Sequence, residues 1–341
     1  MNMPIPTNMT AVLLGEQNGS LTIGKIPVPQ PGPAQVLVRM AASPINPSDL
    51  GFLSGAYGFQ KLFPIVPGFE GSGTVVAAGS GLLPRLWMGK RVACAGSEAG
   101  GAWAEFQIVR AALCVPLQNH LSLEQAATML VNPLTVLAFF DIVKRDKHAA
   151  LVNTAAASAL GRMILRLGLR YRVPVINIVR RREQADLLRS LGAEFVLQSD
   201  DPTFNQKLRD LMHRLKATLI LDAVSGELGR QIMDVAPTGS TAIVYGSLSG
   251  KNIEVTIRAL SYDRKRVTGF YLPNRLAQKN ILQVFWDMQR VQLLMTKELQ
   301  TTIQKRFPLS AAQQAVELYR RNPTAGKVLL VADSEKIRLD Q

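Results

Sequence analysis

Apolar and polar residues follow two different patterns along this 341-residue chain. Up to about residue 126, short apolar runs lie between turn signals rich in glycine and proline, which predicts an all-β, barrel-like region. These runs are 36–40, 71–79, 91–94 and 102–108. From Ser122, which can cap a helix, apolar strands alternate with amphipathic helices. That alternation predicts a parallel sheet with helices on both faces, so we expect an α/β chain with two domains.

The second pattern also gives approximate bounds for its elements. The expected strands are 149–153, 175–179, 195–197, 219–222 and 240–245. The expected helices are 158–172, 183–191, 203–215 and 226–233. A further amphipathic helix is expected over 276–294, and the apolar run 328–331 predicts a last strand. If that strand returns to the first barrel, the first domain is discontinuous.

Residues 151–161 predict a turn that can hold a phosphate group. A buried strand runs into 154–161 (TAAASALG), a tight turn of mostly small residues that opens a helix. Small side chains let a pyrophosphate approach the backbone, and the helix N-terminus offers unpaired N–H groups. Of the three glycines in the dinucleotide-binding fingerprint only Gly161 is present, so an ordinary strand-to-helix junction is the alternative.

The end of the second strand of this pattern indicates which dinucleotide fits. An NAD site usually carries Asp or Glu about 20 residues further on, where it binds the ribose 2′-hydroxyl. Here Arg180, Arg181 and Arg182 stand at that point, 19 residues after Gly161 for the first of them, and no acid comes before Glu183. Guanidinium groups bind a 2′-phosphate bidentately. The sequence therefore favours NADP(H) over NAD(H), with a solvated basic turn as the alternative.

The charge of the chain is unevenly distributed. Lys and Arg number 39 against 25 Asp and Glu, a formal net charge of +14. Residues 1–130 hold 7 basic and 6 acidic residues, so the excess lies in 131–341. An anionic partner of the later part is therefore expected, with nucleic acid, a membrane surface or a phosphorylated small molecule as candidates. A solvated basic surface is the alternative.

Several classes of protein and site are excluded or disfavoured by residue counts. Two cysteines, Cys94 and Cys114, exclude a disulfide framework and an all-cysteine zinc site, and no two of the three histidines have ligand spacing. No secretory or transit segment and no transmembrane run is recognised. A soluble, reducing, cytoplasmic setting without membrane partners is expected.

Several segments together resemble the medium-chain dehydrogenase/reductase superfamily over nearly the whole chain. They are Asn46-Pro47-Ser48-Asp49, 67–73 (PGFEGSG), Asn132-Pro133-Leu134-Thr135, Leu191-Gly192-Ala193 and Tyr245-Gly246-Ser247. Within that superfamily the chain looks most like the zinc-independent quinone oxidoreductases and 2-enoyl thioester reductases. The resemblance implies a GroES-like β-barrel catalytic domain, 1–126 with 273–341, and a doubly wound Rossmann domain that binds NADP, 127–272.

The resemblance also predicts whether the protein has a metal site and which residue transfers a proton. Zinc-dependent members carry Cys and His where this chain has Asn46 and Phe69, which are not strong zinc ligands, so no metal site is expected. Residues 54–58 (SGAYG) match the enoyl thioester reductase pattern in which a tyrosine protonates or polarises the enolate, which gives Tyr57 that catalytic role. Asn46 is a second catalytic candidate, near the nicotinamide ribose or the substrate. The alternatives are packing of Tyr57 in its glycine-rich loop and turn capping by Asn46, and for Glu70 a structural role is expected.

The cofactor-binding residues are carried over from the same resemblance. Asn132 is expected beside the nicotinamide, Arg180 and Arg182 at the 2′-phosphate, and Lys327 over the cofactor from the last segment. The remaining positions are Ala157, Ser158, Ala159 and Leu160 at the pyrophosphate, Tyr245, Gly246, Ser247 and Leu248 beside the cleft, and Phe270, Tyr271 and Leu272 at the carboxamide. Relatives usually form dimers through the edge strand of the cofactor sheet, for which 240–247 and 267–272 are candidates.

Together these observations predict a zinc-independent, NADPH-dependent reductase of an activated C=C bond, in a 2-enoyl thioester or an enone. An NADPH:quinone oxidoreductase is the alternative within the enzyme class. A remote alternative is a non-catalytic basic RNA-binding protein on a dehydrogenase fold, which lacks the aromatic-rich strands that stack bases. A thioester of coenzyme A or acyl carrier protein would agree with the basic later part of the chain, whereas a plain quinone needs no such charge.

Overall fold

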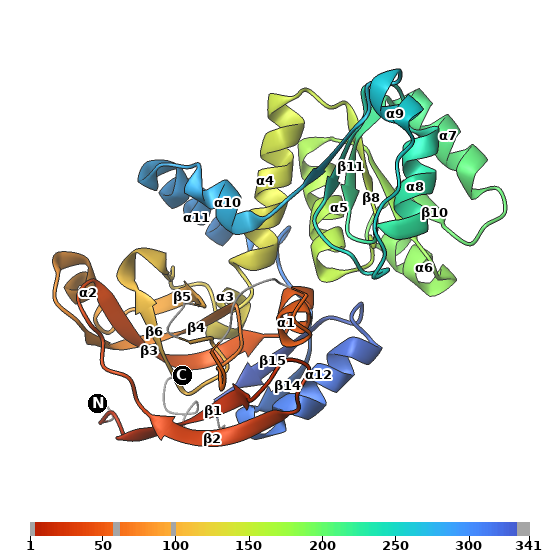
Figure 1. Ribbon diagram of the computed structural model, residues 1–341. Coiled ribbons are helices and arrows are strands. Elements are labelled where there is room, and N and C mark those ends of the chain that lie inside the picture. The colour runs from red at the N-terminus through yellow and green to blue at the C-terminus, as the bar shows by residue number, and fades with distance from the viewer. Residues whose placement is uncertain (1–3, 57–61, 97–99, 333–341) are drawn as a thin grey trace. The chain divides into compact units, whose positions relative to one another are not determined.

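The computed structural model describes residues 4–56, 62–96 and 100–332 (Figure 1). The chain forms two units. Unit 1 comprises Met1–Asn132, Met288–Thr296 and Gln300–Gln341, and unit 2 comprises Pro133–Asp287 and Lys297–Leu299. The domain boundaries predicted from the sequence, 1–126 with 273–341 and 127–272, stay a proposal.

Unit 1 is built on a seven-stranded sheet and a two-stranded hairpin, β1–β2. Its strands are β1 (Asn8–Leu14), β2 (Leu21–Pro27), β3 (Gln35–Pro44), β4 (Glu70–Ala78), β5 (Arg91–Ala95), β6 (Phe106–Arg110), β7 (Cys114–Pro116), β14 (Ile303–Pro308) and β15 (Lys327–Val331). Its helices are α1 (Pro47–Leu53), α2 (Leu82–Trp87), α3 (Leu123–Ala126) and α12 (Ala312–Arg321), with short 3₁₀ turns η1 (Ala111–Leu113) and η2 (Leu309–Ala311).

The last strand of the chain returns to the sheet formed by the first strands. The sheet order is β14-β15-β3-β4-β5-β7, with β6 paired to β3, and β15 runs antiparallel to β3 with Leu330 opposite Ser43. Alternate residues of β3 and its neighbours, such as Val36, Val38 and Val92, are fully buried in one apolar cluster. The prediction that residues 328–331 rejoin the first domain is therefore confirmed.

Two details of unit 1 differ from the sequence prediction. The strand expected over 102–108 begins only at Phe106, because the Trp103 backbone bonds instead to Val12 and Pro67, at 2.9 and 3.0 Å. The hairpin β1–β2 lies largely within residues 10–126, which were predicted to form short strands between turns, but the first strand assigned there begins at residue 36. The first difference arises from pairing between segments distant in the sequence, which local patterning does not reveal. The hairpin pairs neighbouring segments, with Leu14 opposite Leu21, so it is a local feature that the strand pattern missed.

Unit 2 is a parallel sheet with helices on both faces. Its strands are β8 (Ala150–Asn153), β9 (Val175–Val179), β10 (Phe195–Gln198), β11 (Ala217–Asp222), β12 (Thr241–Val244) and β13 (Arg266–Gly269). Its helices are α5 (Ala159–Tyr171), α6 (Arg182–Ser190), α7 (Phe204–Leu215), α8 (Gly226–Val235), α9 (Ile257–Ser261) and α10 (Leu272–Ala277). Helices α4 (Val131–Arg145) and α11 (Ile281–Leu294) each begin in one unit and continue into the other.

The strand order of this sheet is β10-β9-β8-β11-β12-β13, with every pair parallel. The chain moves outward from β8 to β10 and then returns to β11 on the other side. Helices α7 and α8 pack in one apolar cluster, and α5 and α6 pack in another, so both faces are covered (Figure 1). This is the doubly wound fold predicted above, and ligands of such sheets bind where the order reverses, outside the carboxyl ends of the strands.

The single helix expected over 276–294 is two helices. Helix α10 ends at Ala277, and α11 begins at Ile281. Asn280 and Gln283 exchange two hydrogen bonds, because each side-chain oxygen accepts from the other's backbone N–H, at 2.9 and 3.0 Å. Such a reciprocal box marks a helix start, which explains the interruption.

Candidate functional site

The turn between β8 and α5 has the geometry of a phosphate cradle. Ser158 caps α5, and its Oγ accepts the Gly161 N–H at 3.0 Å. Ala155 lies in the left-handed region with φ of 48°, which tightens the turn. The predicted residues Ala157, Ser158, Ala159 and Leu160 therefore end the turn and open the helix, where backbone N–H groups and the helix dipole favour an anion.

Gly161 packs directly against that turn. A Cβ at this position would lie 2.5 Å from the backbone oxygen of Ala156. We expect Gly161→Ala to lower the free energy of unfolding by about 1–3 kcal/mol, because the turn must shift to relieve the overlap. Chemical denaturation measures this. Gly15→Ala, whose Cβ meets nothing within 4 Å, is the control and should change stability little; equal effects would contradict the packing role.

Buried polar side chains that the sequence analysis missed hold the turn in place through hydrogen bonds. The Asn153 amide donates to the Gly161 carbonyl and to Asn177 Oδ1, both at 3.1 Å. Thr154 Oγ1 donates to Asp222 Oδ1 at 2.9 Å and accepts the Ala223 N–H. Asn153 and Asp222 each end an apolar strand, and that position is the sequence signal that could have identified them. A buried polar side chain requires a hydrogen-bond partner, so a polar residue at the end of such a strand indicates a polar contact there.

The three consecutive arginines follow the end of β9 directly. Arg180, Arg181 and Arg182 are all exposed, and the first two donate their backbone N–H groups to Gln184 Oε1 at 3.3 and 3.1 Å. The nearest ion-pair partner of Arg182 is Asp186, at 4.0 Å with both side chains largely exposed. The backbone here is held by Gln184, whereas the guanidinium groups remain in solvent, where they can meet an anion.

The predicted residues after β12 and β13 form an aromatic group. The ring of Phe139 lies 5.1 Å from Tyr245 and 4.9 Å from Phe270. The Tyr245 hydroxyl is buried without a hydrogen-bond partner among the residues that the structure describes, and burial together with the charge of Asp222 raises its pKa. Gly246, Ser247 and Leu248 follow at the same carboxyl edge, and Tyr271 and Leu272 begin α10. The structure thus brings the predicted residues of unit 2 to one edge of the sheet, at the ends of β8, β9, β12 and β13.

In unit 1, Asn46 and Lys327 lie in one buried polar cluster. Asn46 is fully buried; its Nδ2 donates to Glu70 Oε1 at 2.9 Å and its Oδ1 accepts from Lys327 Nζ. Asp49, which the sequence analysis did not single out, accepts the N–H groups of Asn46 and Phe69, at 2.7 and 3.0 Å. The catalytic role of Asn46 and the cofactor role of Lys327 stay predictions.

Glu70 connects this cluster to the start of α4. Its Oε2 accepts the N–H groups of Leu130 and Val131, at 3.0 and 2.9 Å, so the carboxylate lies at the helix N-terminus. These contacts agree with the structural role expected for Glu70, which stays a prediction. Asn132, the predicted nicotinamide contact, is the next residue and is 7% exposed. Tyr57, the predicted catalytic acid, lies outside the described residues.

The part of the chain that the structure describes has neither a group of metal ligands nor a helix that could span a membrane. Across residues 4–56, 62–96 and 100–332, no three His, Cys, Asp or Glu side chains gather as metal ligands would. Within the same residues, every helix is too short or too polar to cross a membrane.

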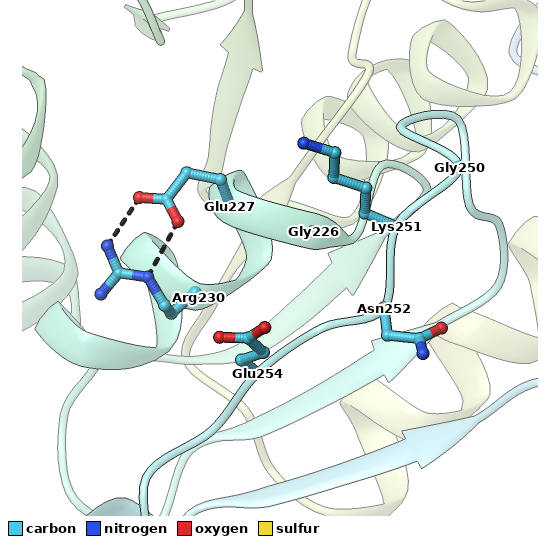
Figure 2. A pocket seen from close by; sticks show the side chains of 7 residues that line it. All are labelled: Gly226, Glu227, Arg230, Gly250, Lys251, Asn252 and Glu254. Carbon is cyan, nitrogen blue, oxygen red and sulfur yellow. Dashed lines mark hydrogen bonds and ion pairs between the residues drawn. The ribbon is translucent and has the colours of Figure 1, made fainter.

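Unit 2 also contains a polar cavity of about 500 Å³ at the first turn of α8. Figure 2 shows Glu227 and Arg230 joined by two hydrogen bonds on one wall, with Lys251, Asn252 and Glu254 on the facing loop. The bonds from Arg230 Nε and Nη2 to the Glu227 carboxylate measure 2.9 and 2.6 Å. This cavity shares no residue with the predicted cofactor positions.

Comparison with known proteins places this fold and site in a family. Residues 32–119 match the alcohol dehydrogenase GroES-like domain, and residues 159–287 match the zinc-binding dehydrogenase family. The mitochondrial enoyl-[acyl-carrier-protein] reductase of Caenorhabditis elegans is 33% identical over 73% of this chain and 73% of its own length. The human enzyme of that name is 28% identical over 70% of this chain but only 65% of its own length.

A solved structure is similar over almost the whole chain. A Mesorhizobium loti protein, provisionally named NADPH:quinone reductase, is 34% identical, with a TM-score of 0.90 over 96% of this chain and 100% of that one. The chain belongs to the medium-chain dehydrogenase/reductase superfamily, in its branch of enoyl and quinone reductases. It is therefore an oxidoreductase, as the sequence predicted.

Proposed function

We propose that this chain is a zinc-independent reductase that uses NADPH to reduce an activated C=C bond, in a 2-enoyl thioester or an enone. The observation that carries the proposal is the exposed arginine run directly after β9, where an NAD site would present a carboxylate. The Mesorhizobium loti relative, named as an NADPH enzyme, supports the same choice of cofactor. The relatives named as enoyl reductases support the choice of acceptor.

The residues of unit 2 fit a dinucleotide. The capped N-terminus of α5 and the small side chains of the 154–158 turn leave backbone N–H groups for the pyrophosphate. Arg180 and Arg182 would bind the 2′-phosphate, and the groups after β12 and β13 would flank the nicotinamide half. When bound, NADPH supplies the hydride, which goes to the β-carbon of the acceptor.

The protein must then stabilise the negative charge that forms on the acceptor and supply a proton. Hydride addition to the β-carbon moves the C=C electron pair toward the carbonyl, so an enolate forms, and protonation of the α-carbon completes the reduction. We assign the proton, or the hydrogen bond to the enolate oxygen, to the Tyr57 hydroxyl, which is neutral at pH 7 because its ordinary pKa is about 10. No metal is needed for this step, and Asn46 and Phe69 are not the residues that would hold zinc.

A comparison of acceptors separates the two enzyme candidates. The name of the Mesorhizobium loti relative favours a quinone as the second candidate. We expect kcat/KM for a crotonyl thioester to exceed that for a small quinone by at least about tenfold, since the basic later part of the chain attracts an anionic thioester. Steady-state NADPH oxidation with a quinone, an enone and a crotonyl thioester measures this. A higher kcat/KM for the quinone would replace the leading candidate.

Salt-sensitive RNA retention with no oxidation of NADPH by any acceptor would favour the RNA-binding alternative instead.

A homodimer in a cytoplasmic setting completes the proposal. Strand β13 is one of the two outer strands of the sheet, with β10 at the other edge, so the candidate 267–272 is supported, whereas 240–247 is corrected because β12 lies between β11 and β13. The exposed Arg266 and Thr268 belong to this outer strand. Sedimentation velocity should give a dimer. The Arg266 and Phe270 N–H groups donate toward β12, so the Gly269 N–H faces away from it, and a Gly269→Pro variant, which removes that outward donor, should shift the protein toward monomer. The two curated relatives compared above are mitochondrial, so fractionation must establish the compartment.

A further inference from the structure

Lys327 is a buried cation with its partners inside unit 1. It is 1% exposed, and its Nζ donates to the Ile45 carbonyl at 3.3 Å as well as to Asn46 Oδ1. The Tyr319 ring lies 5.6 Å from the ammonium group. A lysine placed to bind a cofactor phosphate would direct its ammonium to solvent or to an open groove, whereas this one points into the protein.

Two buried carboxylates surround the same cluster. Asp49 and Glu70 are 0% and 1% exposed. Burial raises the pKa of each carboxyl group, and the positive charge of Lys327 opposes that rise. Burial likewise lowers the pKa of Lys327, while the two carboxylates raise it. Uncompensated buried charges are strongly destabilising, so each group depends on the others.

The cluster forms one continuous path from the last strand to the first turn of α4. Lys327, at the start of β15, donates to the Asn46 oxygen, and the Asn46 amide donates to Glu70. Glu70 in turn accepts the N–H groups of Leu130, which precedes α4, and of Val131, its first residue, just before Asn132. The orientation of the Asn46 amide is decided at both ends, because one neighbour is a donor and the other an acceptor.

We propose that Lys327 is a positioning residue, the internal counter-ion that holds Asn46 and Glu70 so that Glu70 fixes the start of α4 and thereby Asn132. It acts through the interior of unit 1 and makes no direct contact with the dinucleotide. The role of Asn132 in this inference rests on the proposed function. The charge balance itself does not, and it can be measured on the protein without cofactor.

A double-mutant cycle between Lys327 and Glu70 tests the counter-ion role. Lys327→Met leaves two buried carboxylates without their cation, and Glu70→Gln leaves the cation with one carboxylate fewer. In the double variant the Asn46 amide can rotate, so that its oxygen accepts from the amide introduced at position 70. We expect the double variant to have a higher melting temperature than Lys327→Met, while the surface control Lys90→Met behaves as wild type.

The same variants separate positioning from cofactor contact. We expect Lys327→Met to lower kcat by about 10²-fold, the scale of a misplaced site, with the Kd for NADPH, measured by fluorescence, within about threefold of wild type. The double variant should recover part of kcat. A Kd raised by more than about thirtyfold with kcat unchanged would instead show a direct phosphate contact and overturn the inference.

The outcomes of the stability test do not depend on turnover. If Lys327→Met fails to fold and the double variant folds, the counter-ion role is supported. If the double variant is no more stable than Lys327→Met, or if neither folds, the role is contradicted. If the wild-type protein reduces no acceptor, the proposed function fails, yet the stability pattern of the cofactor-free variants still tests the cluster.

Discussion

Replacing both Arg180 and Arg182 with alanine should raise the Kd for NADPH by about 10²- to 10³-fold and leave the Kd for NADH within about threefold of its wild-type value. Each guanidinium contact with a phosphate is a charge-assisted hydrogen bond worth about 1.5–3 kcal/mol, and tenfold in Kd corresponds to about 1.4 kcal/mol. NADH lacks the 2′-phosphate, so it loses nothing. Quenching of protein fluorescence by each dinucleotide measures both values.

A matched variant on the same helix controls for net charge. Arg189 is exposed on α6, about two turns after the arginine run, and forms an ion pair with Asp186 at 2.9 Å. Arg189→Ala removes one positive charge without touching the end of β9, so it should alter the Kd for NADPH less than about threefold. If the double variant bound NADPH as wild type does, or weakened NADH equally, the 2′-phosphate would not be bound here.

Substituting Tyr57 with phenylalanine should reduce kcat on a crotonyl thioester by about 10²-fold or more, the usual contribution of a positioned general acid. The ring is retained and only the hydroxyl is removed, so the enolate loses its donor while binding of NADPH should hardly change. Steady-state kinetics at saturating NADPH measure the loss, and the Kd for NADPH measured in parallel shows that the cofactor site is intact.

Another tyrosine provides the control for this substitution. Tyr262 follows α9 and is 81% exposed, so Tyr262→Phe removes a hydroxyl of the same kind from solvent. It should leave kcat unchanged. A Tyr57→Phe variant that turned over at the wild-type rate would remove Tyr57 from the chemistry and would reopen the question of which group supplies the proton.

The strands and helices of unit 2 could be predicted in detail because each of them is encoded by a pattern within its own segment of the sequence. Each strand is a short apolar run, and each following helix shows its own amphipathic period. The strand predicted over 175–179 has the observed bounds, and the helix predicted over 203–215 begins one residue later than expected. The sequence analysis gave no order for these strands, because right-handed crossovers limit the order without determining it.

Most of the missing features depend on contacts between distant residues. Strand β14 carries no clear local period and is defined by its pairing with β15, whereas the hairpin β1–β2 pairs neighbouring segments and is a local feature that the prediction missed. Lys327 and Asn46 are 281 positions apart, and nothing near Lys327 in the sequence indicates a buried lysine. Resemblance to a family therefore gave Lys327 a role at the cofactor, whereas the structure shows what its ammonium group contacts.

The break between α10 and α11 is a third case. A helix-start signal was present in the sequence, but the continuous apolar period outweighed it in the prediction. The apolar period continues through 276–294, so periodicity alone predicts one helix. Asn280 and Gln283 nevertheless have the spacing of a capping box, and their reciprocal hydrogen bonds begin a new helix.

The central claim is that this chain transfers hydride from NADPH to carbon without a metal ion. The most direct test is a single turnover of chelator-treated protein, with its zinc content measured, using NADPH deuterated at the transferred position and a crotonyl thioester. We predict that deuterium appears at the β-carbon of the saturated product at the same rate as with protein that was not treated with chelator. Absence of the label from the product, or transfer only after zinc is added back, would contradict the account.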